Sequence, residues 1–443
     1  MSNLEEVKKE IAEYDYVRLS LCDLNGTYRG QLVAGRHAAS YLENGLGMFE
    51  GFLLAGPRTE KVLVDDPRNN NAGNMLCFPD AHTLRPVPWV GDGVKVGEML
   101  CEPRWKKGGL PQEACPRYVA RKQLNRLDEL GYKLYSGYEI EFRMVNKETM
   151  DPVFDGEEAY CQRTLNKYAD ILLHFDKNFR RSNIDVERYH PEFGPGMFEA
   201  VTRPKYGIES PDMVLNLKQG LMEMSDSKSA TVTVTFMSKP DNDETPTGIG
   251  AHFNFSLWNK SGDSLFYDAD TPDNLSVVAK QWIAGIMKHS RALCAFSSPT
   301  VNCYRRIHQS YFPSAITWGI EDRGACFRIK NDGPSSTYIE NRLPSGKCNP
   351  YLVLASTIAA GLDGVMNNLE CPSPGPRENA ETLPSSLSEA LEELEQDEAL
   401  VDALGSELVT WFVKCKRDGE IAKYKYLTTD EERFGLEKKV YFL

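Results

Sequence analysis

Short acidic pairs are the first residues in this sequence that could do chemistry. In "YEIEF", Glu139 and Glu141 are two positions apart, and residues two apart in a strand project from the same face. Two carboxylates on one face repel each other unless a cation lies between them. The alternative is a solvated strand face, so this motif alone does not distinguish a metal site from a charged surface.

A second acidic pair flanks a tight turn. In "HPEFGPGMFEA", a Gly-Pro-Gly segment separates Glu192 from Glu199, so the chain can fold back and bring both carboxylates together. The alternative is an ordinary loop with two exposed acids, in which His190 would be a surface histidine.

Two further motifs each combine a charged or imidazole group with a polar neighbour. In "GIGAHFNFSLW", His252 and Asn254 share one strand face, and the preceding glycines permit close approach of a ligand or backbone. A lone strand histidine is more often a satisfied core residue. In "YIENRLPSGKCNPYL", Glu340 and Arg342 again stand two apart, and the alternative is a simple cross-strand ion pair.

Arginine is concentrated in "YRRIHQSYFPSAITWGIEDRGACFRI", residues 304–329. The segment contains Arg305, Arg306, Arg323 and Arg328, in a chain with 51 Lys+Arg against 64 Asp+Glu. Clustered guanidinium groups usually hold a planar anion, carboxylate or phosphate. The alternative is a set of surface ion pairs.

Together the motifs supply a set of carboxylates with one imidazole. These six candidate ligands are Glu139, Glu141, Glu192, Glu199, Glu340 and His252. Oxygen-rich ligation suits Mg²⁺ or Mn²⁺ better than Zn²⁺. Two such ions beside arginines suit phosphoryl transfer, in which little other chemistry is required of the protein. The sequence has no Walker A motif and no kinase glycine-rich loop, so those phosphate-binding designs are excluded.

The elements that would position these residues are strands mixed with helices. A hairpin turning at Asn25-Gly26 is expected in 16–33, and Ser386 with Glu389 forms an expected capping box. Period-two alternation predicts strands, and helical spacing with Pro, Asn and Gly signals predicts helices. The expected strands are 133–145, 231–240 and 250–258, and the expected helices are 115–131, 349–365 and 384–400. This mixture indicates an α+β fold.

Bulk composition limits the partners and the compartment. The chain has 443 residues, enough for two domains or three. Residues 102–116 are predicted to be a junction between domains. A net charge of −13 argues against nucleic acid as a partner. No apolar run is long enough to span a membrane, and the N-terminus lacks a signal-peptide core. The 11 cysteines form no C-x-x-C pair, which favours reduced thiols in the cytoplasm.

These motifs, and the order in which they follow one another along the chain, resemble those of class I glutamine synthetases. The matching patterns are E-x-E, H-x-E-x-G-P-G-x-x-E, G-x-G-x-H-x-x-x-S, N-x-Y-x-R, R-x-x-x-x-R, E-x-R and N-P-Y-L. Segments such as "KQWIAGIMKHSRAL" are most similar to the lengsin-like branch, some members of which have no known catalysis. The resemblance implies a β-grasp domain in 1–108 and a glutamine synthetase-type catalytic domain in 109–443. It also implies two stacked hexameric rings, with each active site formed between neighbouring subunits.

The resemblance also implies roles for individual residues, with ATP as co-substrate and two Mg²⁺ or Mn²⁺ ions per site. Glu141, Glu192 and Glu199 correspond to ligands of one metal, and Glu139, His252 and Glu340 to ligands of the other. Glutamate would be held by Arg306, Arg342 and the backbone of Gly248. Phosphates would be held by Arg323 and Arg328, with Arg323 catalytic, and nucleotide by His190 and Ser256.

Departures from the family pattern fall on the acceptor-amine side. The family has a catalytic Glu where this chain has Phe312, Asn254 replaces a second His that affects a glutamate contact, and Tyr338 replaces an Arg near the nucleotide. Glu50 is a loose counterpart of the ammonium-binding acid, and the adenylylated tyrosine has no counterpart.

Three hypotheses follow. The first is a ligase that activates the γ-carboxylate of glutamate, or a close analogue, with ATP and joins it to an amine other than ammonia. The second is a true glutamine synthetase with an altered ammonium site. The third is a non-catalytic, lengsin-like structural protein, for which five clustered carboxylates have no obvious use.

Overall fold

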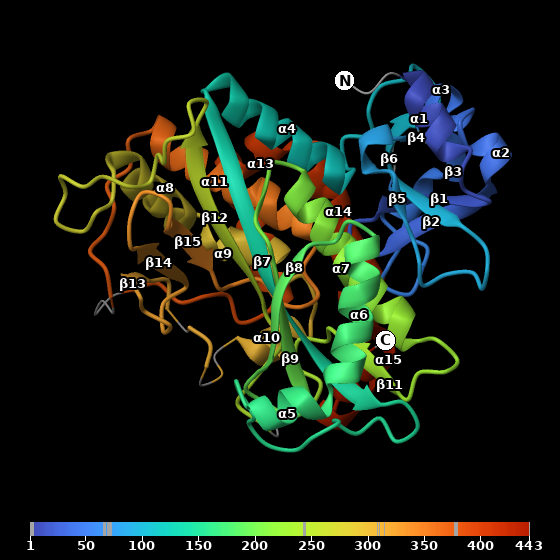
Figure 1. Cartoon of the computed structure of the whole chain (residues 1–443). Helices are drawn as coiled ribbons and strands as arrows, with labels where there is room; N and C mark the ends of the chain where they lie inside the picture. The colour runs from blue at the N-terminus through green and yellow to red at the C-terminus, as the bar shows by residue number, and fades with distance from the viewer. Residues whose placement is uncertain are drawn as a thin grey trace.

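The computed structural model describes residues 4–64, 68, 73–241, 245–307, 309, 311–313, 315–375 and 380–442. Two β-sheets and a set of mostly C-terminal helices make up this part of the chain. Figure 1 shows the small N-terminal sheet at one side of the molecule and the long strands of the second sheet crossing its centre.

The first sheet has six strands in the order β2-β1-β6-β4-β3, with β5 beside β6. Their bounds are β1 (Tyr16–Cys22), β2 (Tyr28–Ala34), β3 (Leu46–Phe49), β4 (Asn74–Pro79), β5 (Arg85–Pro86) and β6 (Val96–Trp105). The predicted hairpin is confirmed: β1 and β2 pair antiparallel, and Gly26 has a φ of +79°, which favours glycine. Next to this hairpin, β1 pairs parallel with β6.

The second sheet has nine strands and carries most of the candidate residues. Its order is β13-β14-β15-β12-β7-β9-β8, and β10 and β11 also pair with β7. The bounds are β7 (Tyr132–Asn146), β8 (Val186–Pro191), β9 (Met197–Thr202), β10 (Lys205–Tyr206), β11 (Val232–Thr235), β12 (Ala251–Asn259), β13 (Trp318–Ile320), β14 (Phe327–Asn331) and β15 (Thr337–Asn341). The expected strands at 133–145 and 250–258 are therefore confirmed.

The helices cover the sheets and fill the C-terminal part of the chain. They are α1 (Leu4–Ile11), α2 (Gly35–Ala38), α3 (Tyr41–Asn44), α4 (Pro116–Glu129), α5 (Gln162–Lys167), α6 (Ala169–Arg181), α7 (Glu209–Ser225), α8 (Val277–Lys288), α9 (Ser290–Ser297), α10 (Cys303–Arg306), α11 (Pro350–Met366), α12 (Leu387–Gln396), α13 (Glu398–Leu404), α14 (Ser406–Gly419) and α15 (Asp430–Tyr441). Short 3₁₀ turns lie at η1 (Glu50–Leu53), η2 (Ala81–Thr83) and η3 (Ile421–Tyr424).

Helix α11 is the buried helix expected from its apolar sequence. It packs against α4, α8, α9 and α13, which explains why nearly all of its residues are buried. The Asn349 side chain accepts a hydrogen bond from the Tyr351 N–H, as an N-cap does, and Pro350 occupies the first turn.

Two expected elements differ in detail from the structure. The strand predicted over 231–240 is only Val232–Thr235, because β11 pairs with just the last four residues of β7. The helix predicted over 384–400 is divided, because Asp397 ends α12 and its side chain caps α13. Ser386 accepts the Glu389 N–H as expected, whereas the Glu389 carboxylate binds the N–H and hydroxyl of Ser385.

The α+β fold class is confirmed by this mixture of helices and sheets. The division between residues 108 and 109 stays a prediction. Within the described part of the chain, no helix combines the length and apolar character needed to cross a membrane.

Candidate active site

Strand register brings the candidate ligands into neighbouring rows on the second sheet. His252 of β12 lies opposite Glu139 of β7, and Glu141 of β7 lies opposite Glu199 of β9. On the far side of β9, His190 of β8 lies opposite Glu199. The side chains of paired residues lie on the same face of the sheet. The two glutamates of β7 therefore have His252 on one side, and Glu199 followed by His190 on the other.

A third row extends the site toward the other edge of the sheet. Asn254 of β12 lies opposite Glu340 of β15, and Glu340 lies opposite Arg328 of β14. Arg342 follows just after β15, and its guanidinium donates to Glu340. The ion pair between these two residues, the alternative interpretation of the fourth motif, is therefore present in this structure.

These rows line one cavity of about 920 Å³. Fourteen of the predicted site residues line it: Glu139, Glu141, His190, Glu192, Glu199, Gly248, His252, Arg306, Phe312, Arg323, Arg328, Tyr338, Glu340 and Arg342. The metal, phosphate and acid candidates thus converge, although they come from segments about 200 positions apart in the sequence.

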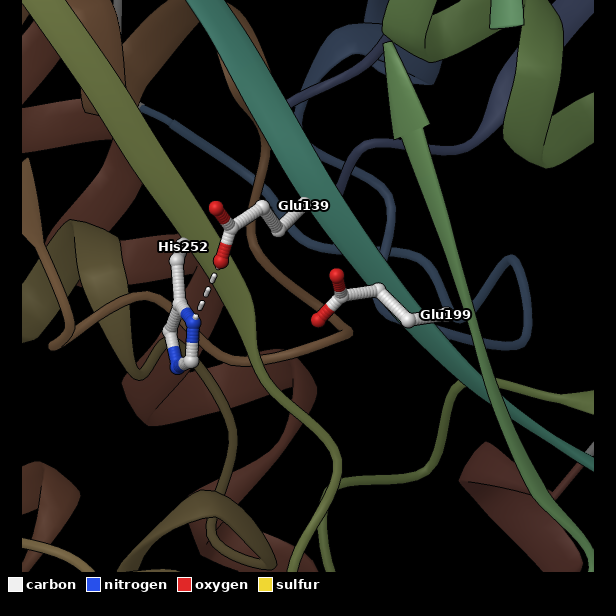
Figure 2. A group of neighbouring side chains, drawn as sticks. All are labelled: Glu139, Glu199 and His252. Carbon is white, nitrogen blue, oxygen red and sulfur yellow. Dashed lines mark hydrogen bonds and ion pairs between the residues drawn. The ribbon is translucent and has the colours of Figure 1, made fainter. Parts of the chain in front are cut away.

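Two groups of side chains have ligand atoms close enough to share a cation. Glu139, Glu199 and His252 form one group, which Figure 2 shows pointing into a common space from β7, β9 and β12. His190, Glu192 and Glu199 form the other, and within each group the ligand atoms lie within 4.8 Å of one another. The grouping differs from the division into two ligand sets that the resemblance implies, because Glu199 belongs to both groups and His190 joins one.

Crowding of the carboxylates alters their pKa values. Burial, and then the negative charges of Glu141 and Glu199, raise the pKa of Glu192 to about 7. Burial also raises the pKa of Glu199, with neighbouring carboxylates adding to it. By itself burial would raise the pKa of Glu139, but the hydrogen bond and charge of His252 lower it to about 2. The site holds more negative charge than its own histidines neutralise, as a cation site does.

Arg306 is a buried cation without a carboxylate partner among the described residues. Its guanidinium donates to the carbonyls of Arg342, Leu343 and Pro344 at 3.3–3.5 Å, and burial lowers its pKa to about 10. Only 5% of Arg306 is exposed. A buried guanidinium that lines a cavity in this way is suited to an anionic ligand.

The backbone before β12 makes room for this arginine. A Cβ on Gly248 would lie 2.7 Å from the Arg306 Cγ, and one on Gly250 would lie 2.6 Å from its Nη2. Glycine is needed at both positions because a side chain would displace the guanidinium. The Gly250 N–H donates to Glu141 Oε2 at 2.5 Å, which ties the same segment to the acidic row.

Arg323 and Arg328 occupy different surroundings. Arg323 is exposed at the cavity, and no hydrogen bond or ion pair of its side chain is seen with the described residues. Arg328 donates to Glu321 and, at 3.1 Å, to Glu340. Arg305 is turned away: it pairs with Glu437 at 2.7 Å and Asp430 at 2.6 Å, so the ion-pair alternative holds for this member of the cluster.

Phe312 lines the cavity against the buried arginine. It is 8% exposed, and the Arg306 guanidinium lies 4.4 Å from its ring centroid. Next to it Tyr311 stacks on Phe193 with centroids 5.8 Å apart, and both rings line the cavity. An apolar, aromatic wall therefore faces the acidic rows.

Some predicted residues lie outside this lining, and some lining residues were not predicted. Asn254 donates to Glu139 at 3.3 Å, and Ser256 accepts from the Trp258 indole. Glu50, on η1 of the small sheet, is buried and accepts the Gly73 N–H. Their proposed roles stay predictions.

Tyr160 is a lining residue that sequence reasoning missed. Its ring stacks on His190 with centroids 4.4 Å apart. It lies in a connecting segment with no periodic pattern, so nothing in its local sequence points to the cavity. Phe193 was also missed, although it stands inside the second acidic motif.

Comparison with known proteins identifies relatives along the whole chain. The family model described as "Glutamine synthetase, catalytic domain" matches residues 113–434. A glutamine synthetase of Thermotoga maritima is 31% identical over 431 residues, covering 93% of this chain and 94% of the relative. Lengsin of Rattus norvegicus is 29% identical over 451 residues, covering 94% of this chain and 75% of the relative. A solved structure described as a GmaS/ADP complex is 28% identical with a TM-score of 0.85, covering 98% of this chain and 99% of that chain.

Proposed function

Given that the chain belongs to the glutamine synthetase family, with lengsins among its relatives, we propose that it joins glutamate, or a close analogue, to an amine other than ammonia. The family's reaction is an ATP-dependent ligation. The observation that carries the finer proposal is Phe312, whose ring forms part of the cavity wall where the family places a carboxylate.

The donor set fits divalent cations. In each of two groups, carboxylate oxygens and one imidazole nitrogen lie within 4.8 Å of one another, and the partly buried Glu192 carries a raised pKa that a bound cation would reverse. We propose that Glu139, Glu141, Glu192, Glu199, His252 and Glu340 hold two Mg²⁺ or Mn²⁺ ions, with His190 beside them. Such ions supply charge neutralisation for phosphate oxygens.

The arginines of the cavity divide between the two anionic substrates. Arg306 is buried and holds the α-carboxylate of the acid, with Arg342 beside it and the Gly248 backbone next to the amino group. Arg323 is exposed at the cavity and takes the transferring phosphoryl group, and Arg328 holds the nucleotide phosphates. Tyr338 and His190 border the nucleotide side of this arrangement.

The reaction proceeds in two displacements. A γ-carboxylate oxygen attacks the γ-phosphorus of ATP, the bond to ADP breaks, and an acyl phosphate forms. The amine nitrogen then attacks the acyl carbon, phosphate leaves with the C–O bonding pair, and the departing phosphate takes the proton that the nitrogen gives up. Positive charge on Arg323 stabilises the phosphoryl oxygens on which charge develops.

The acceptor side favours an amine that carries carbon. The sequence between Arg306 and Trp318 contains no Asp or Glu, so this segment offers no carboxylate to bind ammonium or take its proton. Phe312, Tyr311 and Phe193 instead provide apolar surface. Burial of alkyl or aryl groups there gains about 25 cal/mol per Å² of apolar area.

The assembly and the compartment are part of the proposal. Glu50 does not line the cavity of its own chain. A neighbouring subunit in a two-ring dodecamer would bring it to the amine side of the site, as the family resemblance implies. We also propose a β-grasp domain in 1–108, a catalytic domain in 109–443, and a cytoplasmic location.

Similarity to lengsin favours a second candidate, a non-catalytic structural role. Convergence of six metal-ligand candidates, beside a buried arginine that has no carboxylate partner in the described ranges, argues against it, since a structural protein gains nothing from that charge crowding.

The experiment is phosphate release with ATP, Mn²⁺ or Mg²⁺ and glutamate against a panel of amines that includes ammonia. We expect alkyl or aryl amines to give higher kcat/KM than ammonia. Efficient use of ammonia would instead favour an ordinary glutamine synthetase activity. Nucleotide binding without turnover on any amine would favour the structural role.

A further inference from the structure

A second cavity lies where the small sheet, the second sheet and the C-terminal helices meet. Its volume is about 270 Å³, and it is lined by the β1–β2 turn, α7, α14, α15 and the segment before α11. Three lysines line it: Lys218, Lys347 and Lys416. No aspartate or glutamate is among its described lining residues, in a chain whose net charge is −13.

Of the three lysines, only one is paired with a carboxylate of the described part of the chain. The Lys416 ammonium donates to Glu420 at 3.3 Å and to the Asn25 side chain at 2.6 Å. Glu420 also accepts hydrogen bonds from the Tyr441 hydroxyl and from the Val301 N–H. Its carboxylate is therefore shared among Lys416, Tyr441 and Val301.

Among the residues that the structure describes, Lys218 has neutral hydrogen-bond partners only. Its ammonium donates to the carbonyls of Gly346 at 2.7 Å and Cys348 at 3.2 Å, and it lies 5.3 Å from the Phe236 ring centroid. The thiols nearby do not supply charge, because burial raises the pKa of Cys348 to about 11 and that of Cys22 far above its usual value.

Lys347 has no hydrogen-bond acceptor for its ammonium among the described residues. Burial, and then the charge of Lys218, lower its pKa to about 7. Two ammonium groups facing one small cavity repel each other, and the unfavourable charge is relieved when an anion lies between them. The second cavity therefore gathers positively charged groups, whereas the first cavity gathers carboxylates.

We propose that the second cavity is a binding site for a small dianionic oxyanion, of the phosphate or dicarboxylate class, held by Lys218 and Lys347. The volume of about 270 Å³ admits a compact anion and is small for a nucleotide. Thr300 and Gln219 line the same space, and the Gln219 amide, which donates one N–H to Glu223 at 2.9 Å, has a second N–H.

The segment between Glu340 and α11 joins this site to the first cavity. Arg342 lines the first cavity, and Lys347, five positions later, lines the second. Between them the Gly346 N–H donates to the Ile249 carbonyl at 2.9 Å, next to the glycines that accommodate Arg306. An anion in the second cavity therefore contacts a segment that also supports the acid-binding arginines.

The test measures the reactivity of the Lys347 amine itself, because phosphate can also enter the first cavity. The full-length protein is acylated with trace acetic anhydride, and the labelling rate of Lys347 is followed by peptide mass spectrometry. Inorganic phosphate, succinate and chloride are compared at equal ionic strength, with the exposed Lys107 as internal control.

We expect phosphate or succinate to slow labelling of Lys347 at least about tenfold, since a bound anion blocks and protonates the amine, with Lys107 unchanged. Protection by phosphate alone, or by succinate alone, assigns the ligand class. Equal labelling rates in all three salts would overturn the proposal.

A second measurement uses the phosphate-induced rise in melting temperature in three variants. The rise should fall in Lys347→Met and persist in Lys107→Met, and part of it should persist in Arg323→Gln. If it is unchanged in Lys347→Met and lost in Arg323→Gln, phosphate binds only in the first cavity and the proposal is wrong. If Lys347→Met does not fold, the wild-type labelling result decides.

Discussion

The guanidinium of Arg306 lies against the ring of Phe312, 4.4 Å from its centroid. The cation proposed to hold the acid and the ring proposed to contact the amine are therefore in direct contact. A cation–π contact of this kind is worth more when desolvated, and Arg306 is only 5% exposed. Any change at Phe312 acts on the neighbouring acid site as well.

Phe312→Ala should shift preference from larger amines toward ammonia. Removing the ring takes away apolar contact worth about 1.5–3 kcal/mol, so the ratio of kcat/KM for the best alkyl or aryl amine to that for ammonia should fall about tenfold or more. Steady-state kinetics on both acceptors measure this ratio. Phe312→Leu is the control, because it keeps an apolar side chain and should keep most of the preference. An unchanged ratio in Phe312→Ala would show that this ring does not contact the amine.

Arg306→Lys should raise KM for the acid about tenfold to a hundredfold and leave KM for ATP nearly unchanged. Lysine keeps the charge but loses the planar fork that holds a carboxylate through two hydrogen bonds, a loss of about 1.5–3 kcal/mol. The adjacent Arg305→Lys is the matched control, since Arg305 pairs with Glu437 and Asp430 away from the cavity. Equal effects of the two substitutions on KM for the acid would contradict the assignment.

Glu192→Gln should have opposite effects on stability with and without metal. The substitution removes a negative charge from beside Glu141 and Glu199, so the melting temperature in EDTA should rise by a few degrees. It also removes a ligand, so the further rise on adding Mn²⁺ should shrink and turnover should be lost. Differential scanning fluorimetry checks both, with the exposed Glu148→Gln as control. A full Mn²⁺ response in Glu192→Gln would exclude this residue as a ligand.

His289 should make stability depend on pH. Its ring bonds to Asp397 at 2.5 Å and Asp363 at 3.0 Å, joining the end of α8 to α11 and to the α12–α13 junction. Burial lowers the pKa of His289, but these two hydrogen bonds outweigh it and raise the pKa above its usual value. A raised pKa in the folded state means that the stabilisation is full below about pH 6.5 and is lost as pH rises through the folded-state pKa.

His289→Gln should therefore lower the melting temperature more at pH 6 than at pH 9, because the charged pairs contribute about 1.5–3 kcal/mol only when the ring is protonated. Melting curves at both pH values for wild type, His289→Gln and the exposed His37→Gln test this. An equal loss at both pH values would mean that His289 contributes through packing alone.

Local sequence patterns predicted the elements but not all of their limits. Alternation located β7 and β12, and Asn349 with Pro350 located the start of α11. The pattern overextended β11, because strand length there is set by the end of the partner strand β7, which no local signal reports. Likewise the division at Asp397 depends on a side chain that can cap a new helix as well as continue the old one.

Much of the candidate site was predictable because five of its six candidate ligands lie on strands with fixed alternation, and the sixth, Glu192, lies between β8 and β9. Glu139 and Glu141 share a face for that reason, and register then aligns them with His252 and Glu199. Tyr160 was not predictable, since its place against His190 results from a loop whose path is determined by tertiary packing. Arg305 and Arg306 are adjacent in sequence, yet only one faces the cavity, because α10 turns successive side chains to different sides.

The two halves of the cavity differ in how freely they can change over evolutionary time. Most of the proposed metal ligands lie on paired strands, where a shift of register by one position would turn their side chains to the opposite face. Phe312 instead lies in the connection between α10 and β13, outside any ladder of strand hydrogen bonds. With the roles proposed above, substitutions in that connection would alter the amine that is accepted and leave the residues proposed for carboxylate activation unchanged. A fold arranged in this way can give rise to a series of ligases that share one electrophile and differ in their amines.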